Sequence, residues 1–544
     1  MGKPFTRYIK KCNRDGTGQW EQNMAEWLKK AIFYEVYPQS FKDSNGDGIG
    51  DIPGLMEKLD YIRELGMNAI WINPCFDSPF YDAGYDVADY YRVAPRYGTN
   101  EDLKRLFEKA HSYGMHVLLD LVPGHTAVTH PWFLESMKAE KNEYTDRYVW
   151  TDSPYKRMEN VRGIVSILRG ISPRYGTCGV NCFSTQPALN YGFARIDDPA
   201  WQQPVDAPGP RASREELMNI MRFWLGLGCD GFRVDMAGSL VKNDDDKTET
   251  IRLWQEVRSF LDREFPEAVL VSEWGRPEIS LKAGFHMDFF LHFGDTGYMD
   301  LFRTEHPFFN EEGKGDISVF VKHYQENEKA AGGKGMMCMP SGNHDMIRIS
   351  KQLDTRQMKL AYAFIYALPG APFLYYGDEI GMRYVEDLVS VEGGYERTGS
   401  RSPMQWDKST NAGFSSAPAE ALYIPLDPGN DRPDVASQME ETDSLYNTVK
   451  KLISVRQAHS ALQGDGKIEF LYAGDHTYPL VFERSSAEEK VLVIINPSGK
   501  EQECQVPCEG SWEVIYSCGG LPVMESGKVK AAAVSACWMK KILI

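Results

Sequence analysis

The sequence predicts an α/β protein built on a (β/α)8 TIM barrel, with an inserted B domain after strand 3 and a C-terminal antiparallel β-sandwich domain. From residue 31 to about residue 380, short apolar runs alternate with longer amphipathic ones, a rhythm typical of a parallel sheet covered by helices. More than a hundred residues rich in Pro, Gly, Tyr and Asn separate "DLVPGH" from "GFRVD". Such a length is too great for a structureless loop, so we expect it to hold a small domain.

The individual elements follow from local patterns. Seven apolar runs predict buried strands, in "AIFYEVYPQSF", "NAIWIN", "MHVLLDL", "GFRVD", "AVLVSEW", "GMMCMP" and "APFLYY". Pro53 begins one predicted helix, and Thr99 with Asp102 resembles the capping box of another. After the helix in "SLYNTVKKLISVRQAHSAL", short alternating strands predict a β domain. The expected boundaries are 1–125 and 211–465 for the barrel, 126–210 for the inserted domain and 466–544 for the C-terminal domain.

The charge balance excludes some partners. The chain of 544 residues carries 60 Lys and Arg against 77 Asp and Glu, a formal net charge of −17, which disfavours nucleic acid and anionic membranes. The uncharged stretch from Leu360 to Gly377 contains "LPGAP", so it predicts a core helix and a strand rather than a membrane span. The N-terminus shows no apolar core of a signal peptide, and the ten cysteines are scattered. We therefore expect a cytoplasmic protein with reduced thiols.

The stretch "DSNGDGIGD", residues 43–51, has the oxygen ligands of a calcium loop. Counting from Asp43, it fits an EF-hand at loop positions 1, 3, 5, 6 and 9, but position 12 is Gly54 instead of Glu. An aromatic strand, not a helix, precedes it. A structural ion clamp is therefore favoured over a calcium sensor, and a solvated acidic turn is the alternative.

Acidic side chains end three of the predicted strands, at Asp235, Glu273 and Asp345. Active sites of such barrels form where the carboxyl ends of the strands meet. Two carboxyls at about 5–5.5 Å suit a retaining glycosidase, in which one is the nucleophile and the other the acid/base. A single such acid would more simply cap a helix or pair with an arginine. Three acids, accompanied by Asp120, Arg233, His125 and His344, favour catalysis.

These motifs resemble glycoside hydrolase family 13, the α-amylase family, over about residues 28–480. "DLVPGH", "GFRVD", "SEW" and "SGNHD" stand in the order found in that family. The resemblance implies Asp235 as nucleophile, Glu273 as acid/base and Asp345 as the third carboxylate. It also implies that His125, Arg233 and His344 bind the sugar at the cleavage subsite, with Asp120 packed behind. The implied cofactor is structural Ca²⁺, held by the side chains of Asp43, Asn45, Asp47 and Asp51 and the carbonyl of Ile49.

Three further stretches resemble the oligo-1,6-glucosidase and α-glucosidase branch: "QPALN" (186–190), "SRSPMQW" (400–406) and "DAGYD" (82–86). The last implies that Tyr85 is a stacking platform for the sugar, since aromatic faces pack on apolar C–H faces; a core tyrosine is the alternative. The branch also implies that Asp82 and Arg401 approach one another and close the pocket, whereas the simpler interpretation is a rim ion pair.

The chain departs from the family pattern at three positions. Gly124 stands where the family usually has Asn before His125, Ala188 replaces the Asp of the branch signature, and Met236 follows the nucleophile. The first departure removes a side-chain hydrogen bond or moves its source elsewhere. The size of Met236 leaves the linkage preference open.

The leading hypothesis is an exo-acting α-glucosidase that cleaves short α-linked oligosaccharides through a covalent glycosyl-enzyme. One alternative passes the glycosyl group to a sugar, as trehalose synthases and glucanotransferases do. Another is an endo-acting α-amylase with an open cleft. A non-catalytic binding relative is disfavoured, because all three carboxylates are present.

Overall fold

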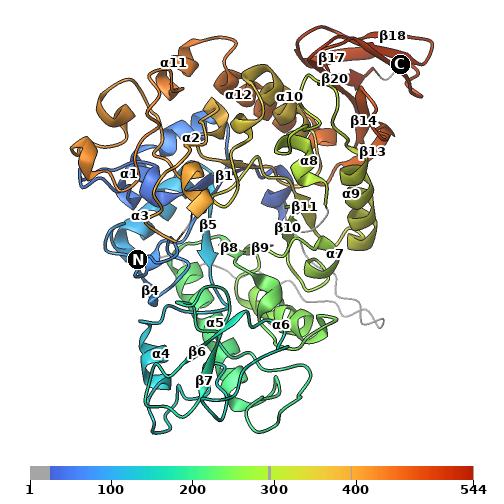
Figure 1. Ribbon diagram of the computed structural model, residues 1–544. Helices are drawn as coiled ribbons and strands as arrows, with labels where there is room; N and C mark the ends of the chain where they lie inside the picture. Colours follow the sequence, from blue (N-terminus) through green and yellow to red (C-terminus); the bar gives the residue numbers. More distant parts are fainter. Residues whose placement is uncertain (1–24, 292–295, 394, 543–544) are drawn as a thin grey trace, which may run out of the picture.

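Eight parallel strands form one barrel in the computed structural model, which describes residues 25–291, 296–393 and 395–542 (Figure 1). The N-terminal segment on which the prediction of a cytoplasmic protein rests lies outside these residues. Around the barrel the strands are ordered β11-β10-β9-β8-β5-β2-β1-β12. They are β1 Phe33–Val36, β2 Ala69–Ile72, β5 His116–Leu121, β8 Gly231–Val234, β9 Val269–Ser272, β10 Met287–Phe289, β11 Met336–Cys338 and β12 Phe373–Tyr375.

The barrel closes between its last two strands. Immediately after β11, Pro340 pairs with Phe373 of β12 in a parallel bridge, and Ser341 donates its N–H to the carbonyl of Phe373 at 2.9 Å. The predicted barrel is therefore confirmed. The closure brings the carboxyl ends of all eight strands to one mouth, where Asp235 follows β8 and Glu273 follows β9.

Helices cover the outside of the barrel, as the amphipathic runs predict. The capping box before α3 is present: Thr99 accepts the N–H of Asp102, and the Asp102 carboxylate accepts the N–H of Thr99. The helices are α1 Ile52–Glu57, α2 Leu59–Leu65, α3 Asn100–Ser112, α5 Pro208–Leu227, α6 Thr248–Glu264, α7 Pro277–Ser280, α8 Tyr298–Phe302, α9 Ser318–Ala331, α10 Thr355–Ile365, α11 Val435–Glu440 and α12 Leu445–Ala458.

The inserted region follows β5 and lies below the barrel in the view of Figure 1. It contains α4 Pro131–Ser136 and the antiparallel pair of β6 Ser166–Arg169 and β7 Thr177–Val180. It has a small apolar core of its own, made by Val149, Met158, Val161, Ala188 and Phe193. The branch signature has Asp where Ala188 stands, and the apolar surroundings of Ala188 explain why this chain carries no charge there.

The C-terminal region forms two antiparallel sheets, as predicted. One holds β13 Lys467–Tyr472, β14 Leu480–Ser485, β15 Lys490–Asn496, β20 Ser535–Lys541 and β17 Trp512–Cys518; the other holds β16 Gln502–Gln505, β19 Lys528–Ala531 and β18 Val523–Glu525. An apolar cluster that includes Val481, Leu492 and Val529 draws residues from both sheets.

The uncharged stretch from Leu360 to Gly377 forms the end of α10 and then β12, as expected from its central "LPGAP". Over the described ranges, the longest apolar helices fall short of what a bilayer crossing requires. A further hairpin, β3 Phe76–Asp77 with β4 Asp89–Val93, belongs to the connection after β2 and flanks the "DAGYD" turn.

Candidate active site

Arg233 is the centre of one half of the site. It projects from β8, is 1% exposed, and reaches three carboxylates: Asp120 at 2.9 Å, Asp235 at 3.2 Å and Glu273 at 2.7 Å. Two of the three predicted strand-end acids, Asp235 and Glu273, are therefore brought together with Asp120 around one cation. One positive charge cannot neutralise three negative ones, so this half of the site favours retention of a proton.

The chain geometry after β8 links Asp235, the predicted nucleophile, to Glu273, the predicted acid/base. Met236 adopts a left-handed conformation with φ of 44°, which is uncommon for a residue with a side chain and is found at functional sites. This turn aims the N–H of Met236 at the second oxygen of Glu273, at 3.1 Å. Both oxygens of Glu273 are thus held, one by Met236 and the other by Arg233.

Asp288 of β10 fixes the loop that carries Glu273. Its buried carboxylate accepts the N–H groups of Trp274, Gly275 and Arg276 at 3.3, 3.3 and 2.9 Å, and the hydroxyl of Ser280 at 2.7 Å. Burial raises the pKa of Asp288 to about 7. No sequence pattern pointed to Asp288, because its strand is only three residues long and has an acid at its centre.

Asp235 and Glu273 form the acidic pair of this half, since both contact Arg233, at 3.2 and 2.7 Å. Burial, and then the negative charge of Glu273, raise the pKa of Asp235 well above its ordinary value. Asp235 therefore holds a proton more readily than a carboxyl in water does.

Asp345 is the centre of the other half. One oxygen of its carboxylate pairs with Arg397 at 2.8 Å and with Arg401 at 3.0 Å. The other oxygen lies 3.4 Å from the imidazole of His344. Burial alone would raise the pKa of Asp345, but His344, Arg397 and Arg401 outweigh it and lower that pKa well below the usual range. Burial lowers the pKa of His344, so the two arginines supply the positive charge. Asp345 is consequently an anion under all ordinary conditions.

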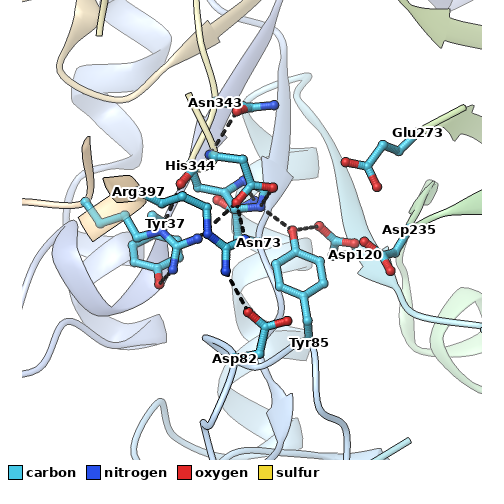
Figure 2. Close-up of polar contacts among 12 residues, drawn as sticks. Tyr37, Asn73, Asp82, Tyr85, Asp120, Asp235, Glu273, Asn343, His344 and Arg397 are labelled. Carbon is cyan, nitrogen blue, oxygen red and sulfur yellow. Dashed lines mark hydrogen bonds and ion pairs between the residues drawn. The ribbon is translucent and has the colours of Figure 1, made fainter. Parts of the chain in front are cut away.

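A buried hydrogen-bond chain joins the two halves (Figure 2). The hydroxyl of Tyr85 lies 2.7 Å from Nε2 of His344 and 3.0 Å from Asp120, and its ring stacks on the imidazole with centroids 5.3 Å apart. On its other side His344 meets the carboxyl of Glu35 at 2.9 Å. Tyr85 and His344 are both buried in this arrangement, so the predicted stacking of Tyr85 on a sugar stays a prediction.

The arginine that pairs with Asp82 differs from the expectation. Asp82 pairs with Arg397 at 3.0 Å (Figure 2) and accepts the amide of Gln186 at 2.8 Å. Arg401 was expected in that position, but it is 1% exposed and lies behind Asp345, where it also donates to the carbonyl of His344 at 2.8 Å. The turn at Tyr395–Ser400 places Arg397 nearer the mouth. The predicted pairing of Asp82 with Arg401 is wrong, and Arg397 takes that place.

His125 lies on the side of the inserted domain and is 1% exposed. Its Nε2 is 2.9 Å from the carbonyl of Tyr85, and its Nδ1 is 3.1 Å from the amide nitrogen of Asn181. Burial lowers the pKa of His125 to about 4, so the imidazole is neutral. Its contact with substrate stays a prediction.

Comparison with known proteins decides the family. The family model for the α-amylase catalytic domain matches residues 35–465. The chain belongs to the α-amylase family. Within it, the chain is 33% identical over 479 residues to the trehalose synthase/amylase TreS of Mycolicibacterium smegmatis, covering 80% of this chain and 77% of that protein. It is 30% identical over 565 residues to the oligo-1,6-glucosidase of Heyndrickxia coagulans, covering 90% and 96%.

Solved structures agree with this assignment. The trehalulose synthase MutB from Pseudomonas mesoacidophila superposes with a TM-score of 0.79 at 25% identity, covering 95% of this chain and all of that one (100%). The protein is therefore an α-amylase-type enzyme of the glycoside hydrolases that acts on α-glucosides, and its relatives include both glucosidases and sugar isomerases.

The predicted calcium loop is compact. Asp43 accepts the N–H groups of Asn45, Gly46 and Gly48, and Asp51 caps α1 by accepting the N–H of Gly54 at 2.6 Å. Carboxylate and amide oxygens at alternating positions fit the chemistry of Ca²⁺. However, within the described ranges the one group of three acidic or histidine side chains with ligand atoms inside 4.8 Å is Asp316, Asp475 and His476, away from this loop. The calcium site, with Asn45, Asp47 and Ile49 as further ligands, stays a prediction.

Proposed function

We propose that this member of the α-amylase family is a retaining, exo-acting α-glucosidase of short oligosaccharides. The observation that carries the proposal is the pairing of Asp235 with Glu273 through Arg233, at 3.2 and 2.7 Å, opposite an Asp345 whose pKa two arginines hold well below its usual range. Retention requires two carboxyls close enough for one to act as nucleophile and the other as acid, and Asp235 and Glu273 directly follow the neighbouring strands β8 and β9.

The reaction proceeds in two displacements. Asp235 attacks the anomeric carbon while Glu273 gives its proton to the departing glycosidic oxygen, which breaks the bond and forms a glycosyl ester on Asp235. Glu273 then takes a proton from water, and the resulting hydroxyl attacks the same carbon to release Asp235. Arg233 stabilises both carboxylates at 2.7–3.2 Å as charge moves between them, and the N–H of Met236 keeps Glu273 oriented.

The wall around Arg397 supports exo action. Arg397 is held from two sides, by Asp82 and by Asp345, and Asp82 is 8% exposed in its side chain. Charge-assisted bonds of this kind can grip the hydroxyls of a terminal sugar. A glucan chain continuing past that sugar would have to displace the pair. The enzyme should therefore remove single residues from chain ends.

Product analysis tests the proposal. Free glucose should appear from the start of the reaction with maltooligosaccharides or isomaltooligosaccharides, and starch should be a poor substrate. Rapid loss of starch–iodine colour with little glucose would show an open cleft and overturn exo action. Asp82→Ala and Arg397→Ala should each lower activity on disaccharides by far more than the factor of up to about five that a rim ion pair of about 0–1 kcal/mol can explain.

Isomerisation is the second candidate, because a 33% identical relative is named a trehalose synthase and the superposed structure a trehalulose synthase. In that reaction a sugar hydroxyl replaces water as acceptor of the glycosyl group. Incubation with maltose, sucrose and trehalose separates the two candidates. Glucose release in proportion to substrate loss indicates hydrolysis, whereas a new disaccharide without equivalent glucose indicates isomerisation.

A further inference from the structure

Asn181 occupies space beside Gly124 that a side chain at position 124 would otherwise fill. A Cβ at Gly124 would lie 2.6 Å from the amide nitrogen of Asn181, which is closer than such contacts allow. Asn181 directly follows β7 of the inserted region and is 1% exposed. The amide of Asn181 can therefore occupy this position only because residue 124 is a glycine.

The orientation of the Asn181 amide follows from its neighbours. Its oxygen lies 3.3 Å from the ammonium of Lys242 and 3.4 Å from the hydroxyl of Ser239, and both of these can donate. Both neighbours donate to this oxygen, and Lys242 does so in either protonation state, so the oxygen faces Lys242 and the NH₂ group faces His125. The backbone of Asn181 is held as well, since its N–H donates to the carbonyl of Gln186 at 3.1 Å.

This orientation selects the tautomer of His125. The Asn181 NH₂ donates to Nδ1 at 3.1 Å, so Nδ1 must be the acceptor and Nε2 must carry the hydrogen. That hydrogen points to the carbonyl of Tyr85 at 2.9 Å, in the turn that also carries Asp82. Both ring nitrogens are thus fixed, and the imidazole cannot rotate without losing two hydrogen bonds.

Lys242 strengthens the arrangement. It is fully buried and donates to the carbonyl of Ser239 at 2.7 Å as well as to Asn181. Within the described ranges it forms an ion pair with neither Asp nor Glu, so its nearest polar partners are these oxygens. Burial lowers the pKa of Lys242 to about 7, and in its ammonium form this side chain polarises the amide and improves the NH₂ group of Asn181 as a donor.

We propose that Asn181 is a positioning residue for the glycosidase reaction: its amide, supplied by the inserted domain, holds His125 in one tautomer and one orientation at the wall of the sugar pocket. The same NH₂ lies 3.8 Å from the sulfur of Met236, next to the nucleophile. Asn181 thereby ties the inserted domain to both the His125 strand end and the loop after Asp235.

Moving the amide between the two positions tests the proposal. Asn181→Ala should lower kcat/KM about tenfold, the value of one buried hydrogen bond, and Gly124→Asn alone should also lower it through the 2.6 Å clash. The double variant Gly124→Asn/Asn181→Ala should recover to within about threefold of wild type. The control Gly124→Leu/Asn181→Ala places a side chain of similar shape, but without an amide, at position 124. Its kcat/KM should stay as low as that of Asn181→Ala.

Two outcomes would overturn the proposal: equal rescue by the leucine variant, or Asn181→Ala within twofold of wild type. Asn181→Asp is an isosteric check for loss of folding. It should keep its melting temperature through an ion pair with Lys242, yet lose activity, because a carboxylate cannot donate to Nδ1. Unchanged activity in this variant would contradict the proposal.

The kinetic tests rest on the proposed function, so a readout without substrate separates the two. ¹⁵N NMR of histidine-labelled protein, with His125→Gln to assign the signal, should show the Nε2–H tautomer in wild type and its loss in Asn181→Asp. The same tautomer in both would overturn the role of Asn181 whatever the reaction. Absence of turnover on every α-glucoside, with the tautomer change present, would instead contradict the proposed function.

Discussion

The two halves of the active site differ in the ratio of cations to carboxylates. The guanidinium of Arg233 contacts three carboxylates. Around Asp345 two guanidiniums contact three carboxylates, because Arg397 also pairs with Asp82 and Arg401 also pairs with Glu392 at 3.5 Å. Burial acts in the same direction on both, yet the pKa of Asp235 is raised and that of Asp345 is lowered. The opposite directions of the two pKa shifts therefore come from the neighbouring charges.

The largest expected effect comes from removing the nucleophile. Asp235→Asn should lower kcat by about 10⁴-fold or more, because an amide cannot form the glycosyl ester. Thermal unfolding should show a folded protein. Trapping with a fluorinated glucosyl donor, followed by mass spectrometry, should label wild type and not the variant. Labelling of the variant would exclude Asp235 as the nucleophile.

Glu273→Gln removes the proposed acid of the same half. Substrates with alkoxide leaving groups should slow by about 10²–10⁴-fold, while glucosyl fluoride, which needs little protonation, should slow far less. Loss of the Glu273 charge should also lower the pKa of Asp235, so the acid limb of kcat/KM for the fluoride should move to lower pH. Equal slowing of both substrates would remove Glu273 from the acid role.

Arg397→Ala tests the opposite half. With one cation fewer, the pKa of Asp345 should rise, but Arg401 still lies 3.0 Å away and keeps Asp345 ionised. Activity on disaccharides should fall by about 30-fold or more, because Asp82 and Asp345 lose the cation between them. Arg383→Ala is a matched control, since Arg383 also holds two carboxylates, Asp427 and Asp431, but is more exposed. A loss of activity in Arg397→Ala no larger than in the control would contradict the assigned role of the pair.

The smallest effect concerns the loop at residues 43–51, which carries none of the triad residues. A chelator should lower the melting temperature by a few degrees, through loss of an ion bound only to the folded state, and leave kcat nearly unchanged. Asp47→Ala should abolish that thermal response, because Asp47 is exposed and one of the predicted ligands. Metal analysis of the purified protein should find about one Ca²⁺ per chain. Its absence, or loss of activity without a thermal shift, would show the structural assignment to be wrong.

Sequence patterns predicted the elements whose signals are local. Apolar runs gave seven of the barrel strands, and strand-end acids gave Asp235, Glu273 and Asp345. The pattern did not show β10, which is three residues long with Asp288 at its centre. Spacing could not decide between Arg397 and Arg401, since the turn at Tyr395–Ser400 determines which one faces Asp82.

Asn181 gave no signal of its own, because an asparagine after a strand is ordinarily a turn residue. The departure at Gly124 was the usable hint. It indicated that a side-chain hydrogen bond was either lost or supplied elsewhere, and the structure shows the amide of Asn181, directly after β7, 3.1 Å from Nδ1 of His125. Contacts between residues 56 positions apart depend on how the inserted region folds back, which no local pattern encodes.

The wall of the pocket has a consequence for how this enzyme could acquire new substrates. Asp82, Gln186 and Arg397 come from three separate connections, after β2, within the inserted region and after β12. None of them lies on the strands that end in Asp235 and Glu273. A loop exchange can therefore rebuild the wall while the bond-breaking pair keeps its scaffold. Changes in these loops, in evolution or in the laboratory, can therefore alter which substrate is accepted while the residues that break the bond stay the same.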